Sequence, residues 1–193
     1  SGLGDVYKRQ LYNTLNFFLR YHYLIMKKIL LISLIIIFSN STFAEEIYLE
    51  PEEFINQTFP LGAPEEDFFV LEDNEMDEVY DLIGDTYHTP LISFWEKEGK
   101  VAYILEMIGK HEFITAGYVV KNNEVVDAKI LVYREKYGWE VRFDSFLKQI
   151  RGQKLNGSKL TKGIYNISGA TMSVDSMREL TKLSLFLYKK VIK

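Results

Sequence analysis

Four runs of β-branched and aromatic residues follow one another between Leu91 and Tyr133, with short turns between them. Residues of this kind favour strands, and turns this short connect neighbouring strands that run in opposite directions. The chain is therefore predicted to fold around an antiparallel meander of strands at 91–96, 101–109, 114–121 and 125–133. The last run alternates in the way expected of one packed face. The residues of this face are Val126, Ala128, Ile130 and Val132.

Helical periodicity flanks the predicted strands on both sides. The first helix is expected over 74–84, with Asn74 as its N-cap and Gly84 as its C-cap. A shorter helical pattern covers 143–150, and the last helix is expected from about 173 to 192, with Ser176 as an alternative start because Ser176 and Glu179 have the spacing of a capping box. Its apolar stripe consists of Val174, Met177, Leu180, Leu183, Leu187 and Val191. These elements predict an α+β domain, in which helices pack on an antiparallel sheet and a C-terminal helix ends the fold.

The N-terminal part of the chain has the composition of an export signal. A basic start at Met26 precedes an apolar run, 29–38, interrupted only by Ser33, and Thr42 and Ala44 are the small residues of a cleavage site. We therefore expect a signal peptide at 26–44, cleaved after Ala44. The alternative is an uncleaved membrane anchor, although a membrane-spanning helix needs about 20 apolar residues. Residues 1–25 precede this methionine and are interpreted as an artefactual upstream extension.

Beyond the signal, two segments differ in composition. Residues 45–90 are acidic and interrupted by prolines, so we expect surface chain with one short helix near 52–56, followed by the amphipathic helix. Residues 91–193 hold the meander and the last helix. They are expected to form the main functional domain.

Composition excludes several classes of function. Without residues 1–44 the chain keeps 18 basic and 26 acidic residues, a formal charge of −8, so nucleic acid is not an expected partner. The chain has no cysteine, which excludes disulfides, thiolate metal sites and cysteine nucleophiles. Its three histidines, His22, His88 and His111, lack the spacing of a zinc motif. Neither a metal site nor a set of catalytic residues is predicted.

A loop of small residues, 166–173, precedes the last predicted helix. Gly169 and Ala170 remove side-chain bulk before Thr171, so its hydroxyl is expected to be accessible to a second molecule. The free N–H groups and the positive dipole end of a helix at this place favour a phosphate. The alternative is an ordinary loop in which Thr171 or Ser173 caps the helix.

The sequence from Ser168 to Thr171, Ser-Gly-Ala-Thr, resembles the signature of the FMN-binding domain family. In that family a flavin transferase joins FMN to the threonine hydroxyl through a phosphoester. The likeness extends over about 101–191, in the order and spacing of stand-alone exported FMN-binding proteins. The same domain type occurs in subunits of the sodium-pumping NADH:quinone reductase and of the Rnf complex. The resemblance implies an FMN-binding domain at 91–193, with FMN covalently bound through Thr171.

Two positions depart from the family pattern. Asn166 stands where the family often has an aspartate, and Phe113 stands in the place of a proline. The Asn166 side chain can make similar local hydrogen bonds in the loop, although the change can weaken recognition by the transferase. Phe113 affects only the entry to a strand.

The site residues come from the motif and from the charged turn after the fourth strand. In that turn, Glu135 and Gly138 are candidate flavin contacts. Arg134, Glu140, Lys110 and His111 stay open between flavin contact and solvated surface, as do the rings of Tyr137, Trp139 and Tyr165 between flavin contact and core. The predicted cofactor-binding residues are Ser168, Gly169, Ala170, Thr171, Ser173, Glu135 and Gly138.

Together these expectations describe an exported flavoprotein electron carrier, in the periplasm or on the outer face of the cytoplasmic membrane. Its partners would be a flavin transferase for maturation and a membrane-associated redox donor or acceptor. A stand-alone enzyme that reduces a small substrate is the least favoured alternative, because no set of catalytic residues is apparent. The alternative is an envelope binding module with the same fold and no flavin, whose acidic N-terminal segment docks a partner.

Overall fold

The computed structural model describes residues 20, 22–28 and 45–192. The chain divides into two compact units, 1–42 and 43–193. In the first unit Arg20 and residues 22–28 are helical, and most of the predicted signal peptide lies outside the described residues. Within the described part of the chain, no helix has the length and apolar character needed to cross a bilayer.

Six antiparallel strands form the main sheet of the second unit, in the order β1-β6-β5-β4-β3-β2. The predicted meander forms its centre. Its strands are β3 (Leu91–Lys97), β4 (Lys100–Ile108), β5 (Phe113–Lys121) and β6 (Glu124–Tyr133). The prediction of an α+β fold built on an antiparallel sheet is confirmed.

The two edge strands come from the acidic segment 45–90 and were not predicted. Strand β1 (Glu46–Ile47) pairs with β6, and β2 (Asp67–Val70) pairs with β3. Strands this short have too few residues for a readable alternation, and their partner strands supply the ladder. The short helix expected near 52–56 is confirmed as α2 (Pro51–Thr58), which begins with a proline at a position that needs no N–H donor.

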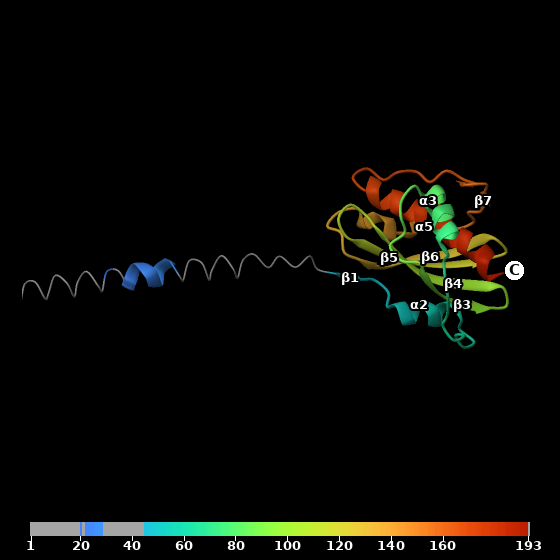
Figure 1. Cartoon of the computed structure of the whole chain (residues 1–193), viewed down its shortest axis with the longest axis horizontal. Helices are drawn as coiled ribbons and strands as arrows, with labels where there is room; N and C mark the ends of the chain where they lie inside the picture. Colours follow the sequence, from blue (N-terminus) through green and yellow to red (C-terminus); the bar gives the residue numbers. More distant parts are fainter. Residues whose placement is uncertain (1–19, 21, 29–44, 193) are drawn as a thin grey trace, which may run out of the picture. The chain divides into compact units, whose positions relative to one another are not determined.

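Helices cover both faces of the sheet, whereas the sequence predicted one packed face. In Figure 1, α3 (Asp73–Ile83) and α5 (Thr171–Val191) lie on one face and α2 lies on the other. The larger core lies under α3 and α5, and a smaller cluster, which includes Phe54, Ala102 and Leu131, lies under α2. The ring of Phe54 lies so close to Gly117 of β5 that a Cβ there would meet it at 2.6 Å.

Two bulges in β6 break the predicted alternation of Val126, Ala128, Ile130 and Val132. The pairing with β5 shifts at Val126 and again at Leu131, so each of these residues is an extra one in the ladder. Ala128 and Ile130 face the larger core, as predicted, but Val126 is exposed and Val132 faces the smaller cluster. An extra residue reverses the face of every position after it, and this is why the period of two failed.

Helix α3 begins at a different cap from the one predicted. Glu72, not Asn74, is the N-cap, and its carboxylate accepts the N–H of Glu75 while the Glu75 carboxylate accepts the N–H of Glu72. Gly84 ends the helix in the left-handed conformation, with φ of 77°, as predicted.

The C-terminal part of the unit carries the site. The helix expected at 143–150 is only a 3-10 turn (Trp139–Arg142) and a short helix α4 (Asp144–Leu147), followed by tight turns. The small hairpin of β7 (Leu155–Asn156) and β8 (Lys159–Leu160) comes next, and α5 ends the unit. Five of the six predicted stripe residues of α5 are fully buried, and Val191 packs against the same core from a partly buried position.

Candidate functional site

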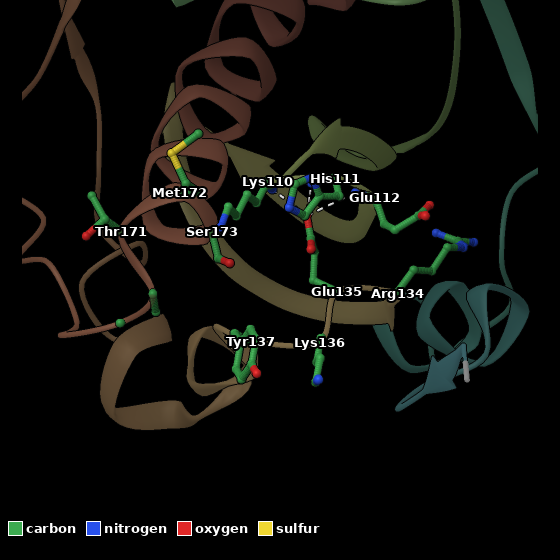
Figure 2. Close-up of a pocket in the computed structure, with 12 residues that line it drawn as sticks. Lys110, His111, Glu112, Arg134, Glu135, Lys136, Tyr137, Thr171, Met172 and Ser173 are labelled. Atoms are coloured by element: carbon green, nitrogen blue, oxygen red, sulfur yellow. Dashed lines mark hydrogen bonds between the residues drawn. The ribbon is translucent and has the colours of Figure 1, made fainter. Parts of the chain in front are cut away.

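Three chain segments approach one another at one end of the sheet. They are the turn 109–112 between β4 and β5, the segment 134–138 after β6, and the loop 167–170 before α5. With the first turn of α5, these segments enclose a cavity of about 490 Å³, and Figure 2 shows its lining. The lining residues are Lys110, His111, Glu112, Arg134, Glu135, Lys136, Tyr137, Gly169, Ala170, Thr171, Met172 and Ser173.

A tight turn delivers the chain to α5. The N–H of Ala170 donates to the carbonyl of Ile167 at 2.9 Å, and Gly169, the third residue of the turn, has φ of 84°. Only glycine takes this conformation without strain, as in a type II turn. Ala170 is buried, whereas Ser168 and Gly169 before it and Thr171 after it are exposed. The turn therefore holds the backbone at Ala170 and leaves the next side chain outside.

Thr171 is the first residue of α5, two residues before the helix start expected from the sequence. Ala170 occupies the N-cap position, where it has no oxygen to offer, and no side chain caps the helix. Neither Thr171 nor Ser173 is a cap, so the alternative of an ordinary capped loop does not describe this helix. The first N–H groups of a helix have no partner within it, so those of α5 are left for another acceptor.

The side chain of Ser173 points in a different direction from that of Thr171. In Figure 2 its hydroxyl points toward the side of Glu135, while the hydroxyl of Thr171 points away from it. Ser173 Oγ is 2.8 Å from the hydroxyl of Tyr133, which donates to the carbonyl of Tyr137 at 2.6 Å. Burial raises the pKa of Tyr133 to about 12 even though the Ser173 hydrogen bond opposes the shift, so the phenol stays protonated and able to donate.

Gly138 lies directly behind Ser173. Its φ is 91°, and a Cβ there would meet Ser173 Oγ at 2.3 Å and the Tyr133 hydroxyl oxygen at 2.8 Å. The absence of a side chain lets the segment after β6 approach the first turn of α5 closely. Gly138 therefore supports the site from behind and does not line the cavity.

Glu135 joins two walls of the cavity. Its carboxylate accepts the consecutive N–H groups of Lys110, His111 and Glu112 in the turn between β4 and β5, the last at 3.0 Å. Partial burial acts to raise its pKa, but these three donors outweigh that effect and hold the pKa of Glu135 below its usual range. Gly109 permits the approach, because a Cβ there would lie 2.9 Å from Glu135 Oε1.

The charges around the cavity are divided between structural and free groups. Arg134 pairs with Glu45 at 2.8 Å and donates to Thr115 Oγ1 at 2.8 Å, so its role is to hold the edge of the sheet. Lys110 and Lys136 form no ion pair with any other described residue. Two cations without an ion-pair partner among the described residues therefore line the cavity, and the Lys136 ammonium group lies 5.3 Å from the centroid of the Tyr137 ring.

Of the three aromatic candidates, only Tyr137 lines the cavity. Tyr137 and Met172 both line the cavity and both have exposed side chains. Trp139 packs edge-on against Phe143, and the ring of Tyr165 is 80% exposed in the loop; neither lines the cavity. Glu140 is also absent from the lining.

The structure brings five of the seven predicted site residues to one cavity and places the other two beside it. Ser168 lies in the turn that leads to Thr171, and Gly138 lies behind Ser173. Lys136 and Glu112 line the cavity and were not predicted, since folding brings them to it; Met172 also lines it and was not among the predicted residues, although it directly follows Thr171. Asn166 accepts a hydrogen bond from Arg178 of α5 at 3.3 Å, which ties the start of the loop to the helix.

A phosphate-bearing aromatic cofactor fits this arrangement. The cavity has the volume of an ordinary small-molecule site, with a hydroxyl and free N–H groups at the helix end, two free cations, and apolar surface at Tyr137 and Met172. Within the described part of the chain, no group of three or more acidic or histidine side chains could hold a metal ion.

Comparisons with known proteins add no relative. No family model, no curated protein and no solved structure matches this chain.

Proposed function

We propose that this protein carries FMN, joined through its phosphate to Oγ1 of Thr171, and works as an exported electron carrier with a membrane-associated redox partner. The observation that carries the proposal is the exposed hydroxyl of Thr171 at the uncapped start of a 21-residue helix, beside the cavity. The Ser-Gly-Ala-Thr sequence that ends at this residue supports the same assignment.

The attachment is a substitution at phosphorus. Thr171 Oγ1 forms the new phosphorus–oxygen bond, and the bond from phosphorus to its leaving group breaks. The leaving group is a nucleoside monophosphate if a flavin dinucleotide is the donor, or water if FMN is, and it takes up the threonine proton. No described residue accepts a hydrogen bond from Thr171 Oγ1, so the base that removes this proton is expected from a separate flavin transferase.

The residues around the cavity have distinct parts in holding the group. The N–H groups of the first turn of α5 and the free ammonium groups of Lys110 and Lys136 suit the phosphate. Tyr137 and Met172 offer apolar surface to the ring system. Glu135 fixes the turn 110–112 by three hydrogen bonds and so keeps this wall in place. When bound, the flavin supplies the electron-transfer chemistry, while the protein supplies tethering and orientation.

The decisive experiment is the intact mass of the chain coexpressed with a flavin transferase, followed by mapping of the peptide that contains 168–173. We expect a gain of one FMN less one water on Thr171. Thr171→Ala should carry no covalent flavin, whereas the matched control Thr161→Ala, which removes an exposed threonine hydroxyl outside the cavity, should be fully modified. Covalent flavin retained by Thr171→Ala would refute the attachment site.

An unmodified wild-type chain under these conditions would instead favour the binding module without flavin. Export is tested separately, by sequencing the N-terminus of the protein recovered outside the cytoplasm. A mature chain that begins at Glu45 would support a cleaved signal, and a longer one would support a retained anchor.

A further inference from the structure

Strand β2 has an open edge at one side of the sheet, far along the sheet order from the segment that follows β6. The Leu71 N–H donates to the Pro90 carbonyl at 2.9 Å, and Phe69 stands opposite Ile92. Because ladder hydrogen bonds alternate along an antiparallel strand, the backbone groups of Phe68 and Val70 point away from β3. The Phe68 N–H is bonded to the Asp67 side chain, which leaves the Val70 N–H as the outward donor.

One face of this edge is apolar. Phe68 and Val70 are 65% and 58% exposed, and Leu91, which stands opposite Val70 on β3, is 49% exposed. Cross-strand partners share a face, so these side chains form one continuous patch. The alternate residue, Phe69, packs into the larger core on the other face.

The other face of the same edge is acidic. A cavity of about 620 Å³ there is lined by four acidic residues, Glu65, Glu66, Asp67 and Glu96, together with Phe94, Val191 and Ile192. None of the four is ion-paired with another described residue. The surrounding segment adds no cation of its own, since residues 45–90 contain 15 acidic residues and no lysine or arginine.

We propose that the open edge of β2 binds an extended segment of a partner protein in which lysine or arginine alternates with apolar residues. A strand added to this edge places successive side chains on opposite faces. Its apolar residues then cover Phe68, Val70 and Leu91, and its basic residues enter the acidic cavity. The backbone of the added strand pairs with the outward groups of Phe68 and Val70.

The charge around the edge selects this partner over a second copy of the chain. Pairing two β2 strands would bring the carboxylates of both copies together, and like charges placed opposite each other are unfavourable. A basic segment instead neutralises them. This inference is independent of the flavin, because the edge shares no lining residue with the cavity at Thr171.

The test uses the unflavinylated protein and a short labelled peptide that alternates lysine and valine, with binding read by fluorescence anisotropy. The control peptide has the same composition, with all lysines before all valines. The alternating peptide should bind about tenfold more tightly, because only its pattern serves both faces. Equal binding of the two peptides would overturn the proposal.

Two variants locate the site. Val70→Pro removes the outward N–H while leaving the ladder to β3 intact, as proline permits at an edge, and should weaken binding about tenfold. The combined change Glu65→Gln, Glu66→Gln and Glu96→Gln should weaken binding about as much and reduce its salt dependence.

The matched control removes the same charge elsewhere, by Asp77→Asn, Glu78→Gln and Asp81→Asn on the exposed side of α3. It should leave binding unchanged within about twofold. An equal loss in both triple variants would show attraction to net charge only and would overturn the proposal. Self-association in sedimentation that Val70→Pro abolishes would overturn it in favour of a second copy.

Discussion

Helices α3 and α5 lie on the same face of the sheet and begin in opposite ways. At α3, Glu72 and Glu75 exchange hydrogen bonds between side chain and backbone, and Asp73 adds a second acidic residue to the first turn. At α5, Ala170 offers no cap and the first turn has no acidic residue. Helix α3 thus satisfies its own N-terminus, whereas α5 leaves its N–H groups and its positive end to a ligand.

The difference shows where α5 obtains its stability. A missing cap costs about 1 kcal/mol, whereas each fully buried Leu, Met or Val contributes about 1.5–3 kcal/mol. Val174, Met177 and Leu180 are buried within the first three turns of α5. Packing therefore holds the helix, and its first turn is free to serve a site.

The largest expected effect comes from breaking the packing behind α5. Gly138→Ala should lower the free energy of unfolding by about 3 kcal/mol, because the new methyl group meets Ser173 and Tyr133 while φ stays positive. Urea denaturation measures the loss. The control Gly99→Ala has φ of 71° with nothing within 4 Å, so it should lose only about 1 kcal/mol. Equal losses would mean that Gly138 provides a turn and no close approach.

Removing the cap of α3 should cost more than removing the hydroxyl of Thr171. Glu72→Ala deletes one of the two bonds of the capping box and should lower the free energy of unfolding by about 1 kcal/mol. Thr171→Ala should change it by less than about 0.5 kcal/mol, since the hydroxyl has no partner within the described chain. A loss for Thr171→Ala as large as that for Glu72→Ala would show that Thr171 stabilises the helix start.

Glu135 should make the wall beside α5 sensitive to acid. Its pKa is lowered in the folded state, so its stabilising contribution is complete above the pKa of an unfolded glutamate, about 4.3, and is lost as the pH falls through the folded value. Denaturation of the wild type and Glu135→Gln at several pH values tests this. The wild type should be more stable by about 1 kcal/mol at neutral pH, and the difference should shrink below about pH 4. A difference independent of pH would contradict it.

The smallest effect on folding is expected from the free cations. Lys110→Gln with Lys136→Gln should change the free energy of unfolding by less than about 0.5 kcal/mol, because neither ammonium group has an ion-pair partner within the described chain. Binding of free FMN by the unflavinylated double variant, followed by fluorescence, should weaken about threefold and depend less on salt. Lys189→Gln, at the far end of α5, is the control and should bind as the wild type does. Equal binding by all three proteins would remove these lysines from the site.

The sequence predicted the elements whose signals are local. The four central strands have enough residues for their composition and turns to show, and the apolar stripe of α5 is long. Strands β1 and β2 were not predicted, because two and four residues are too few to show an alternation of apolar and polar side chains. They form by pairing with β6 and β3. The N-cap of α3 was predicted two residues late because Asn74 is a common N-cap residue, whereas the paired glutamates at 72 and 75 define the start.

The residues of the site likewise divide into those that a short stretch of sequence indicates and those that only folding brings together. The residues from Ser168 to Thr171 are contiguous, so one short stretch of sequence could point to them. Lys136 and Glu112 reach the cavity only through the ladder that places the ends of β4 and β6 together. Gly138 was named as a flavin contact, and its close approach to Ser173 could not be read from the chain, because it depends on how α5 meets the segment after β6.

The second bulge of β6 decides which way the site faces. If Leu131 took a regular place in the ladder and every residue of the strand were kept, the strict alternation from Ala128 and Ile130 would put Val132 under α5 and turn Tyr133 to the opposite face. Tyr133 would then lose its hydrogen bond with Ser173, and the side chains from Arg134 onward would point to the opposite side of the sheet. The face on which the last residues of β6 lie thus decides whether the walls of the cavity come together. A deletion of Leu131 itself would leave Ile130 opposite Ala116 and Val132 opposite Thr115, so Tyr133 would keep its face, whereas one residue inserted between Val132 and Tyr133 would turn Tyr133 away from Ser173 in a single step.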